Sequence, residues 1–168
     1  LASNETRLRV VGNLPYNIST PLIFHLLDQY QAIQDMHFML QLEVVQRLTA
    51  KPGSKHWGRL GIMCQLRCAT EMLFEVPPSA FSPAPKVKSA IVRLTPNQVL
   101  KHTAEELQHI EKLVQAAFAQ RRKTLRNNLK GILTENLIQA QGVDPGARAE
   151  TLDVDDFAKL ALRTGTRA

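Results

Sequence analysis

The chain has 168 residues, 44% of them hydrophobic, and 21 lysines and arginines against 15 aspartates and glutamates give it a net charge of +6. This length can build the core of one ordinary domain or two small ones. No apolar run approaches the roughly eighteen residues of a membrane span, so we expect no membrane partner. The excess of positive charge favours a polyanionic partner.

A short apolar run near the start of the chain ends at a turn. Residues 8–11 predict a buried strand, and periodic apolar residues predict a helix over roughly 20–31. Ser19 or Thr20, followed by a proline, is the expected N-cap of that helix. The 13–16 loop between strand and helix therefore lies at the carboxyl end of a strand, where open α/β sheets bind ligands.

The middle of the chain alternates between apolar runs and loops. Strands are predicted at residues 36–40, 72–76 and 89–94, and helices at 43–50 and about 60–66. The polar 51–55 loop is most simply a solvated connection, although its lysines and the following His56 and Trp57 are an alternative contact for a polyanion. Cys64 and Cys68 lie four residues apart, which favours reduced core thiols on one helical face and a cytoplasmic location.

Four prolines flank a single aromatic residue between the last two predicted strands. The prolines of the 77–87 segment exclude regular structure and hold the loop in one shape. Phe81 is then either a hydrophobic plug or a platform on which a ring stacks. The residues alone favour the plug.

The chain changes character after residue 96. Thr103 and Glu106 form a predicted capping box ahead of an amphipathic helix, and Asp153 or Asp155 is expected to cap a last helix. The second half is therefore predicted to be all-α. We expect two domains, 1–98 and 99–168.

A basic run follows the amphipathic helix. Arg122, Arg126 and Lys130 recur every four residues beside an apolar stripe, which predicts one basic face of a helix. A solvated face with snorkelling arginines is the simplest interpretation. However, Arg121, Arg122 and Lys123 are consecutive and no acidic residue interrupts the run, which favours contact with phosphates. The sequence shows no spacing typical of a metal site.

The sequence Asn13-Leu14-Pro15-Tyr16 resembles the catalytic motif of methyltransferases that use S-adenosylmethionine to methylate exocyclic amines of bases. The N6 lone pair of adenine is delocalised into the ring, so the amine is a poor nucleophile. Two acceptors, the Asn13 side-chain oxygen and a carbonyl of Leu14 or Pro15, would favour a pyramidal nitrogen and free the lone pair. Pro15 stiffens the turn, and Tyr16 offers a flat face to an unstacked base.

Three segments together resemble one family, the bacterial small-subunit ribosomal RNA adenine dimethyltransferases. These segments are residues 11–22, 76–87 and 118–127. The resemblance implies an α/β fold: the second half of a Rossmann-like methyltransferase sheet, followed by a small helical RNA-binding domain. It also implies dimethylation of two adjacent adenines in a hairpin loop of the small-subunit rRNA, within the immature ribosomal subunit.

The same resemblance assigns roles to individual residues. Asn13 and the Leu14 carbonyl would hold the N6 amine, and Asn13 would also line the cofactor site. Tyr16 and Phe81 would sandwich the flipped adenine, so that Phe81 becomes a platform rather than a plug. The positions that would grip the rRNA are Arg121, Arg122, Lys123 and Arg126.

One departure from the family pattern is large. The family's glycine-rich cofactor loop precedes the Asn-Leu-Pro-Tyr motif, whereas only twelve residues precede Asn13 here and none forms a G-x-G pattern. We therefore expect a fragment without the N-terminal cofactor-binding half, inactive alone, that associates with that half or with itself.

Two alternative functions stay open. The large-subunit rRNA methylases that confer macrolide resistance share the chemistry of the first loop. A non-enzymatic RNA-binding assembly factor would keep the fold and lack the chemistry.

Overall fold

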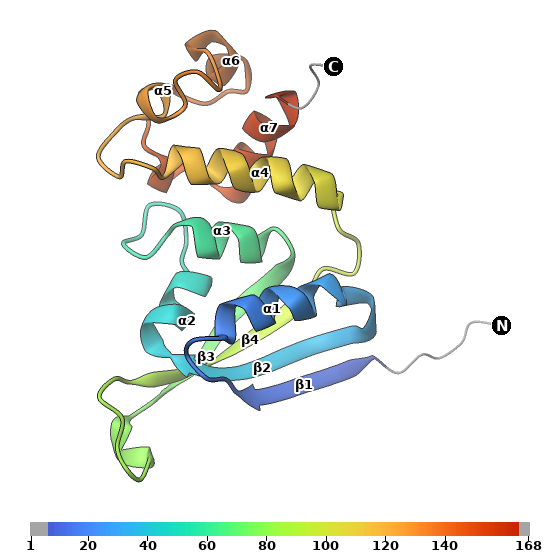
Figure 1. Cartoon of the computed structure of the whole chain (residues 1–168), viewed down its shortest axis with the longest axis vertical. Helices are drawn as coiled ribbons and strands as arrows, with labels where there is room; N and C mark the ends of the chain where they lie inside the picture. Colours follow the sequence, from blue (N-terminus) through green and yellow to red (C-terminus); the bar gives the residue numbers. More distant parts are fainter. Residues whose placement is uncertain (1–6, 165–168) are drawn as a thin grey trace, which may run out of the picture. The chain divides into compact units, whose positions relative to one another are not determined.

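The computed structural model describes residues 7–164 (Figure 1). Its four strands are β1 (Leu8–Asn13), β2 (Ile33–Gln41), β3 (Cys68–Val76) and β4 (Ser89–Pro96). They form one sheet in the order β1-β2-β4-β3, in which β1 runs parallel to β2 and the other two pairs are antiparallel. All four predicted strands and the α/β class are confirmed, but the first strand is not buried as predicted, because Leu8 and Val11 of β1 are 62% and 73% exposed.

The first helices follow the predicted order with shifted ends. They are α1 (Ser19–Asp28), the 3-10 turn η1 (Tyr30–Ala32), α2 (Leu42–Leu48) and α3 (Arg59–Gln65). The predicted cap of α1 is wrong, because Ile18 holds the N-cap position and no side chain caps the helix. Ser19 is the first helical residue, and its hydroxyl donates to the Tyr16 carbonyl at 3.2 Å instead of accepting from the helix.

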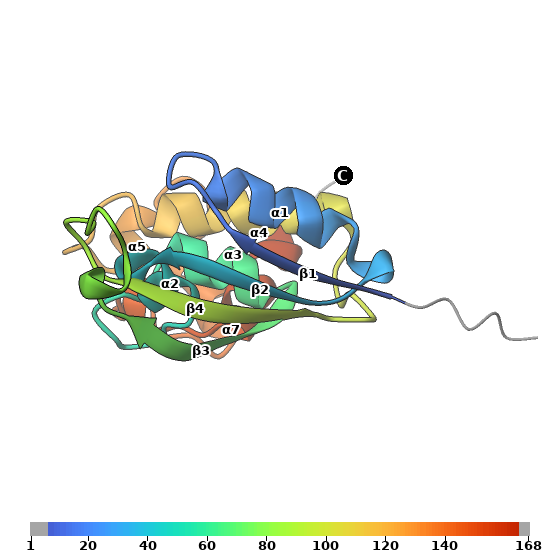
Figure 2. The ribbon, with the colours of Figure 1, turned by 90° about the horizontal axis from the view of Figure 1, so that it is seen from below.

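One face of the sheet forms the core, and α1 and α2 lie on that side (Figures 1 and 2). Met36, Phe38 and Leu40 alternate along β2 and are fully buried, as the period of a strand requires. The opposite face is more exposed and carries both apolar side chains, such as Val11 and Phe74, and charged ones. There the Arg9 guanidinium donates to both oxygens of Asp35 at 2.7 and 2.8 Å, which holds the pKa of that carboxyl below its usual value.

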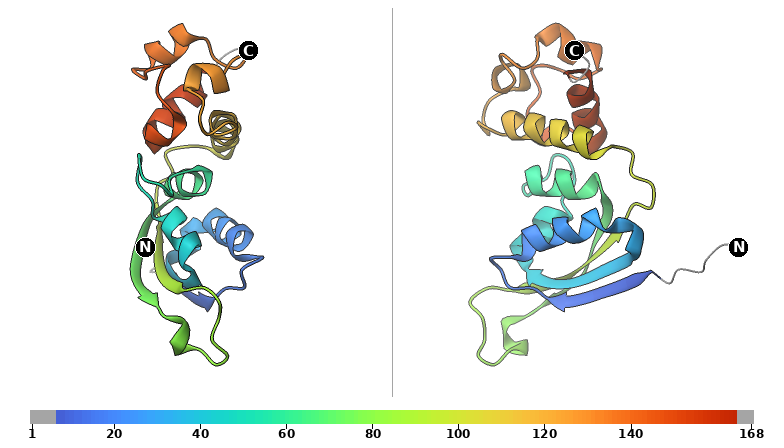
Figure 3. Two further views of the ribbon diagram at one scale, coloured as in Figure 1. Left: turned by 90° about the vertical axis from the view of Figure 1, so that its left-hand side faces the viewer. Right: turned by 45° about the vertical axis from the view of Figure 1, so that its right-hand side comes forward.

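The described part of the chain after β4 contains helices joined by turns and no strand. It contains α4 (Ala104–Ala117), α5 (Leu125–Asn128), α6 (Glu135–Ala140), the 3-10 turn η3 (Ala149–Thr151) and α7 (Val154–Thr164). Both predicted caps are confirmed: Thr103 and Glu106 form the capping box of α4, and Asp153 accepts from the Asp156 amide at 2.8 Å. Helices α4 and α7 pack against each other (Figure 3). The ring centroids of Phe118 and Phe157 lie 5.9 Å apart, and Phe157 is fully buried.

The chain divides into two compact units. The first contains residues 1–49 and 64–99, and the second contains 50–63 and 100–168. Residues 50–63 lie inside the predicted 1–98 domain, yet they group with the helical unit. No helix within residues 7–164 is long and apolar enough to cross a membrane.

Two local predictions are wrong. The basic run is not one helical face, because α4 ends at Ala117 and, within residues 120–130, only 125–128 are helical. Cys64 and Cys68 do not share a helix either, since Cys64 belongs to α3 and Cys68 begins β3. Both thiols are nevertheless free and buried, with their sulfurs 3.4 Å apart. The hydrogen bond from one thiol to the other, together with burial, raises the pKa of Cys68.

Candidate base-binding site

The 13–16 loop is fixed by three hydrogen bonds. The Leu14 amide donates to the Met39 carbonyl at 3.3 Å, which ties the loop to the end of β2. The Pro15 carbonyl accepts from the Ile18 amide at 3.3 Å, and the Tyr16 carbonyl accepts from Ser19. Within residues 7–164, the Leu14 carbonyl accepts no hydrogen bond. Leu14, and not Pro15, therefore offers the free main-chain acceptor of this loop.

A hollow of about 150 Å³ lies beside this loop at the carboxyl ends of β1 and β2. It is lined by Asn13, Tyr16, Met39, Leu40, Phe81, Pro83, Pro85 and Ser89. Residues 77–88, which include the short 3-10 turn η2 (Pro78–Ala80), project beyond the ends of β3 and β4 and supply Phe81 and both prolines (Figure 3). A cavity of this volume accommodates one aromatic ring.

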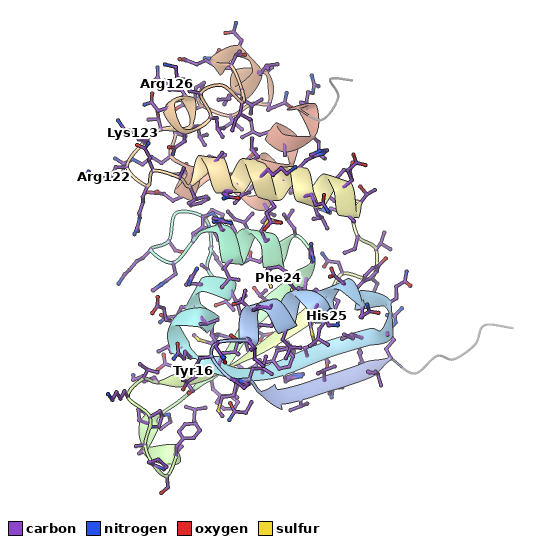
Figure 4. The ribbon with its side chains drawn as sticks, viewed as in Figure 1. Tyr16, Phe24, His25, Arg122, Lys123 and Arg126 are labelled. Atoms are coloured by element: carbon purple, nitrogen blue, oxygen red, sulfur yellow. The ribbon has the colours of Figure 1, made fainter. Side chains whose placement is uncertain are left out.

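Three residues predicted from separate parts of the sequence meet at this hollow. Asn13 ends β1, Tyr16 lies in the following loop (Figure 4), and Phe81 comes from the proline-rich loop. The Asn13 amide is exposed and makes no hydrogen bond to another described residue, so its oxygen is available to a ligand. Leu14 and Pro15 shape the loop without lining the hollow, and the Leu14 side chain is buried.

The floor of the hollow was not predicted from the sequence. Met39 and Leu40 lie near the end of β2, and Ser89 begins β4 opposite Gln41. The position of Met39 follows from the pairing of the first two strands. Because parallel strands end at the same edge of a sheet, the end of the second strand lies beside Asn13. The antiparallel return of β4, which brings Ser89 to that edge, has no comparable local signal.

The lining residues define what this hollow can do chemically. It offers the Asn13 amide, the Ser89 hydroxyl and two aromatic side chains, but none of its lining residues carries a carboxylate or an imidazole. A lining without these groups suits binding and orientation of a flat, hydrogen-bonding ring rather than proton abstraction. No group of three or more potential metal ligands exists among the described residues.

The basic residues predicted to bind RNA lie in the helical unit, around a tight turn between α4 and α5. The Asn128 amide nitrogen closes this turn by donating to the carbonyls of Ala117 at 2.7 Å and Gln120 at 3.0 Å. Arg122, Lys123 and Arg126 project from this region (Figure 4), and Arg121 is also exposed. We call Arg121, Arg122, Lys123 and Arg126 the basic turn. Its one ion pair among the described residues joins Arg126 to Glu135 at 3.6 Å.

An acceptor and two aromatic residues surround a ring-sized hollow at the carboxyl end of a parallel strand, an arrangement that suits a flat ligand with hydrogen-bond donors. The family model for ribosomal RNA adenine dimethylase matches residues 1–164. The chain belongs to this family of rRNA adenine dimethylases.

Curated relatives agree with this membership. The chain is 58% identical over 161 residues to the ribosomal RNA small subunit methyltransferase A of Marinomonas sp. strain MWYL1, covering 96% of this chain and 60% of the relative. It is 60% identical over 154 residues to the protein of the same name from Pseudomonas fluorescens strain Pf-5, covering 92% and 57%. The chain thus spans about three fifths of the length of these relatives.

Solved structures show the same fold. A dimethyladenosine transferase from Plasmodium falciparum is 27% identical, with a TM-score of 0.77 over 94% of this chain and 66% of that one. The 23S rRNA methyltransferase ErmE matches with a TM-score of 0.73 over 95% and 66% at 24% identity, which supports the methyltransferase fold alone.

Proposed function

We propose that this chain is the substrate-binding part of an rRNA adenine dimethyltransferase that methylates the N6 amines of two adjacent adenines in a small-subunit rRNA hairpin loop. The observation that carries the proposal is the meeting of Asn13, Tyr16 and Phe81 around one hollow. Curated relatives named as small-subunit methyltransferases support the choice of rRNA.

The acceptors of the 13–16 loop would orient the amine. The Asn13 side-chain oxygen and the free Leu14 carbonyl accept one N–H each, which favours a pyramidal nitrogen and directs its lone pair out of the ring. S-adenosylmethionine, when bound, would supply the methyl group to this lone pair, and the nitrogen would give up one proton in exchange. None of the lining side chains carries a carboxylate or an imidazole, so these residues would orient the amine rather than take up its proton. The protein contributes orientation and electrostatics.

The cofactor of this reaction is S-adenosylmethionine, which would supply the electrophilic methyl group. Asn13 fits one edge of its site, because it carries an unpaired amide at the carboxyl end of a parallel strand, where open α/β sheets place their cofactors. No other described residue is assigned to the cofactor.

Replacing Phe81 with Leu should show whether Phe81 stacks on a base or only fills space as a hydrophobic plug. Leucine keeps an apolar side chain but loses the aromatic face, and stacking is worth about 1–3 kcal/mol per base. We expect the full-length enzyme carrying this sequence to lose about tenfold or more in methylation at subsaturating RNA, with little change in melting temperature. Phe74→Leu, which changes an exposed ring on β3, is the matched control. A large fall in melting temperature with normal turnover would instead identify Phe81 as a plug.

The basic turn is the proposed grip on the rRNA backbone. Replacing Arg121, Arg122 and Lys123 with Ala should weaken RNA binding and flatten its salt dependence. For each phosphate that the protein no longer neutralises, the slope of log K against log salt falls by about 0.7–0.9. Titration of a small-subunit rRNA hairpin with the 168-residue chain at several salt concentrations measures this slope. A slope equal to that of the wild-type chain would show that these residues form a solvated surface and do not contact RNA phosphates.

The immature small ribosomal subunit is the proposed physiological partner, and the cytoplasm is the proposed place of action. Free buried thiols are in keeping with a reducing compartment. Activity on large-subunit rRNA, or RNA binding without methylation by the full-length enzyme, would favour one of the two alternative functions instead.

A further inference from the structure

The 51–57 loop of the helical unit is a structured element rather than a slack connection. The Ser54 amide donates to the Lys51 carbonyl, and the Trp57 amide donates to the Ser54 carbonyl, both at 3.1 Å. Gly53 has a φ of 80°, a conformation that a residue with a side chain rarely adopts. These successive turns hold the loop in one shape.

Two long-range hydrogen bonds anchor this loop to the segment of residues 145–152. The Gly53 amide donates to the Glu150 carbonyl at 2.7 Å, and the Trp57 indole nitrogen donates to the Leu152 carbonyl at 2.8 Å. Trp57 is only 5% exposed. It therefore anchors the loop and is not available to stack on a base.

The same segment also anchors the basic turn. The Leu125 amide donates to the Ala147 carbonyl at 2.8 Å, and the Arg126 amide donates to the Pro145 carbonyl at 2.9 Å. Ala147 and Glu150 are three positions apart, which an extended backbone spans in at most about 11 Å. The 51–57 loop and the basic turn are thus held side by side on one short scaffold.

Both neighbouring elements carry positive charge that no carboxylate compensates. Lys51 and Lys55 are exposed, and neither takes part in an ion pair within the described residues. The same holds for Arg121, Arg122 and Lys123. By contrast, Lys101 and Lys159 of the same unit lie 3.8 Å from Asp155 and Asp156.

We propose that Lys51 and Lys55 form a second contact with the RNA phosphate backbone, continuous with that of the basic turn. The inference rests on the proposed function and extends its RNA surface to a loop far away in the sequence. Lysine ammonium groups bind phosphates as point charges and read no base, so this contact positions the RNA without selecting its sequence. A rigid loop suits that task, since its lysines need no ordering of the backbone on binding.

The test compares two double variants of the 168-residue chain with equal loss of charge. Lys51→Ala with Lys55→Ala should lower the slope of log K against log salt for a small-subunit rRNA hairpin by about 1.4–1.8, at about 0.7–0.9 for each phosphate that is no longer neutralised. The control, Lys101→Ala with Lys159→Ala, should keep the wild-type slope. Fluorescence of Trp57, the chain's single tryptophan, reports whether the loop stays docked in each variant.

Each outcome decides a specific claim. A wild-type slope in the loop variant, while substitution of the basic turn still lowers it, overturns this inference and leaves the proposed function intact. An equal decrease in the loop variant and the control also overturns it, because net charge alone then explains the effect. RNA binding by the wild-type chain without any salt dependence overturns the proposed RNA grip as well.

Discussion

Replacing Asn13 with Ala in the full-length enzyme should reduce the rate of methyl transfer by roughly 10²–10³-fold, the usual cost of losing one preorganised hydrogen-bonding group in a transition state. RNA affinity should stay nearly unchanged. The Asn13 oxygen makes no hydrogen bond to another described residue, so its removal leaves no partner unsatisfied. Single-turnover methylation measures the rate, and a binding titration measures the affinity.

Asn17→Ala is the matched control for this variant. Asn17 is exposed just after the 13–16 loop and does not line the hollow, so its truncation should leave the rate unchanged. Near-normal single-turnover methylation by Asn13→Ala would show that this amide does not orient the amine. Equal losses of rate in both variants would instead indicate a general distortion of the loop.

The 168-residue chain by itself should bind no measurable S-adenosylmethionine and show no methyltransferase activity. Asn13 is the single described residue assigned to the cofactor, and one amide is too little for a cofactor site. The chain should also self-associate through β1, which pairs only with β2 among the described residues. Its Val11 side chain is 73% exposed, and an open apolar edge is a template for pairing.

Calorimetric titration with the cofactor and sedimentation of the purified chain test both parts. Val11→Lys places a charge on the open edge and should shift the chain towards monomer. Stoichiometric cofactor binding by a monomeric wild-type chain would contradict the proposed limits of the cofactor site.

Local patterns predicted the elements of the fold well and their ends less well. Apolar runs such as residues 36–40 correspond to strands because one face of the sheet is buried against helices. The predictions were wrong where a hydrogen bond to a distant residue, or from a polar side chain, determines the local structure. Asn128 closes the turn that interrupts the basic run, and Ser19 donates to Tyr16 instead of capping α1. The 51–57 loop docks on residues 145–152 through long-range hydrogen bonds, which a local sequence pattern does not predict.

The site was predictable to the extent that its residues lie in motifs. The strand that ends in a polar loop placed residues 13–16 where ligands bind, but the roles of Asn13 and Tyr16 came from the resemblance to a methyltransferase motif. The role of Phe81 depended on the family resemblance, since the residues alone favoured a plug. The residues alone left the choice between the Leu14 and Pro15 carbonyls open, and the resemblance favoured Leu14. The hydrogen bond from the Ile18 amide to the Pro15 carbonyl agrees with that choice. Ser89 was missed because the return of β4 beside β2 is a tertiary feature.

The most direct test of the central claim is mass spectrometry of rRNA after incubation with the full-length enzyme carrying this sequence and S-adenosylmethionine. Nuclease fragments of the small-subunit rRNA should contain N6,N6-dimethyladenosine at two adjacent positions of one hairpin loop, and the Asn13→Ala enzyme should leave them largely unmodified. Methylation confined to large-subunit rRNA, or unmodified adenines in both RNAs, would contradict this account.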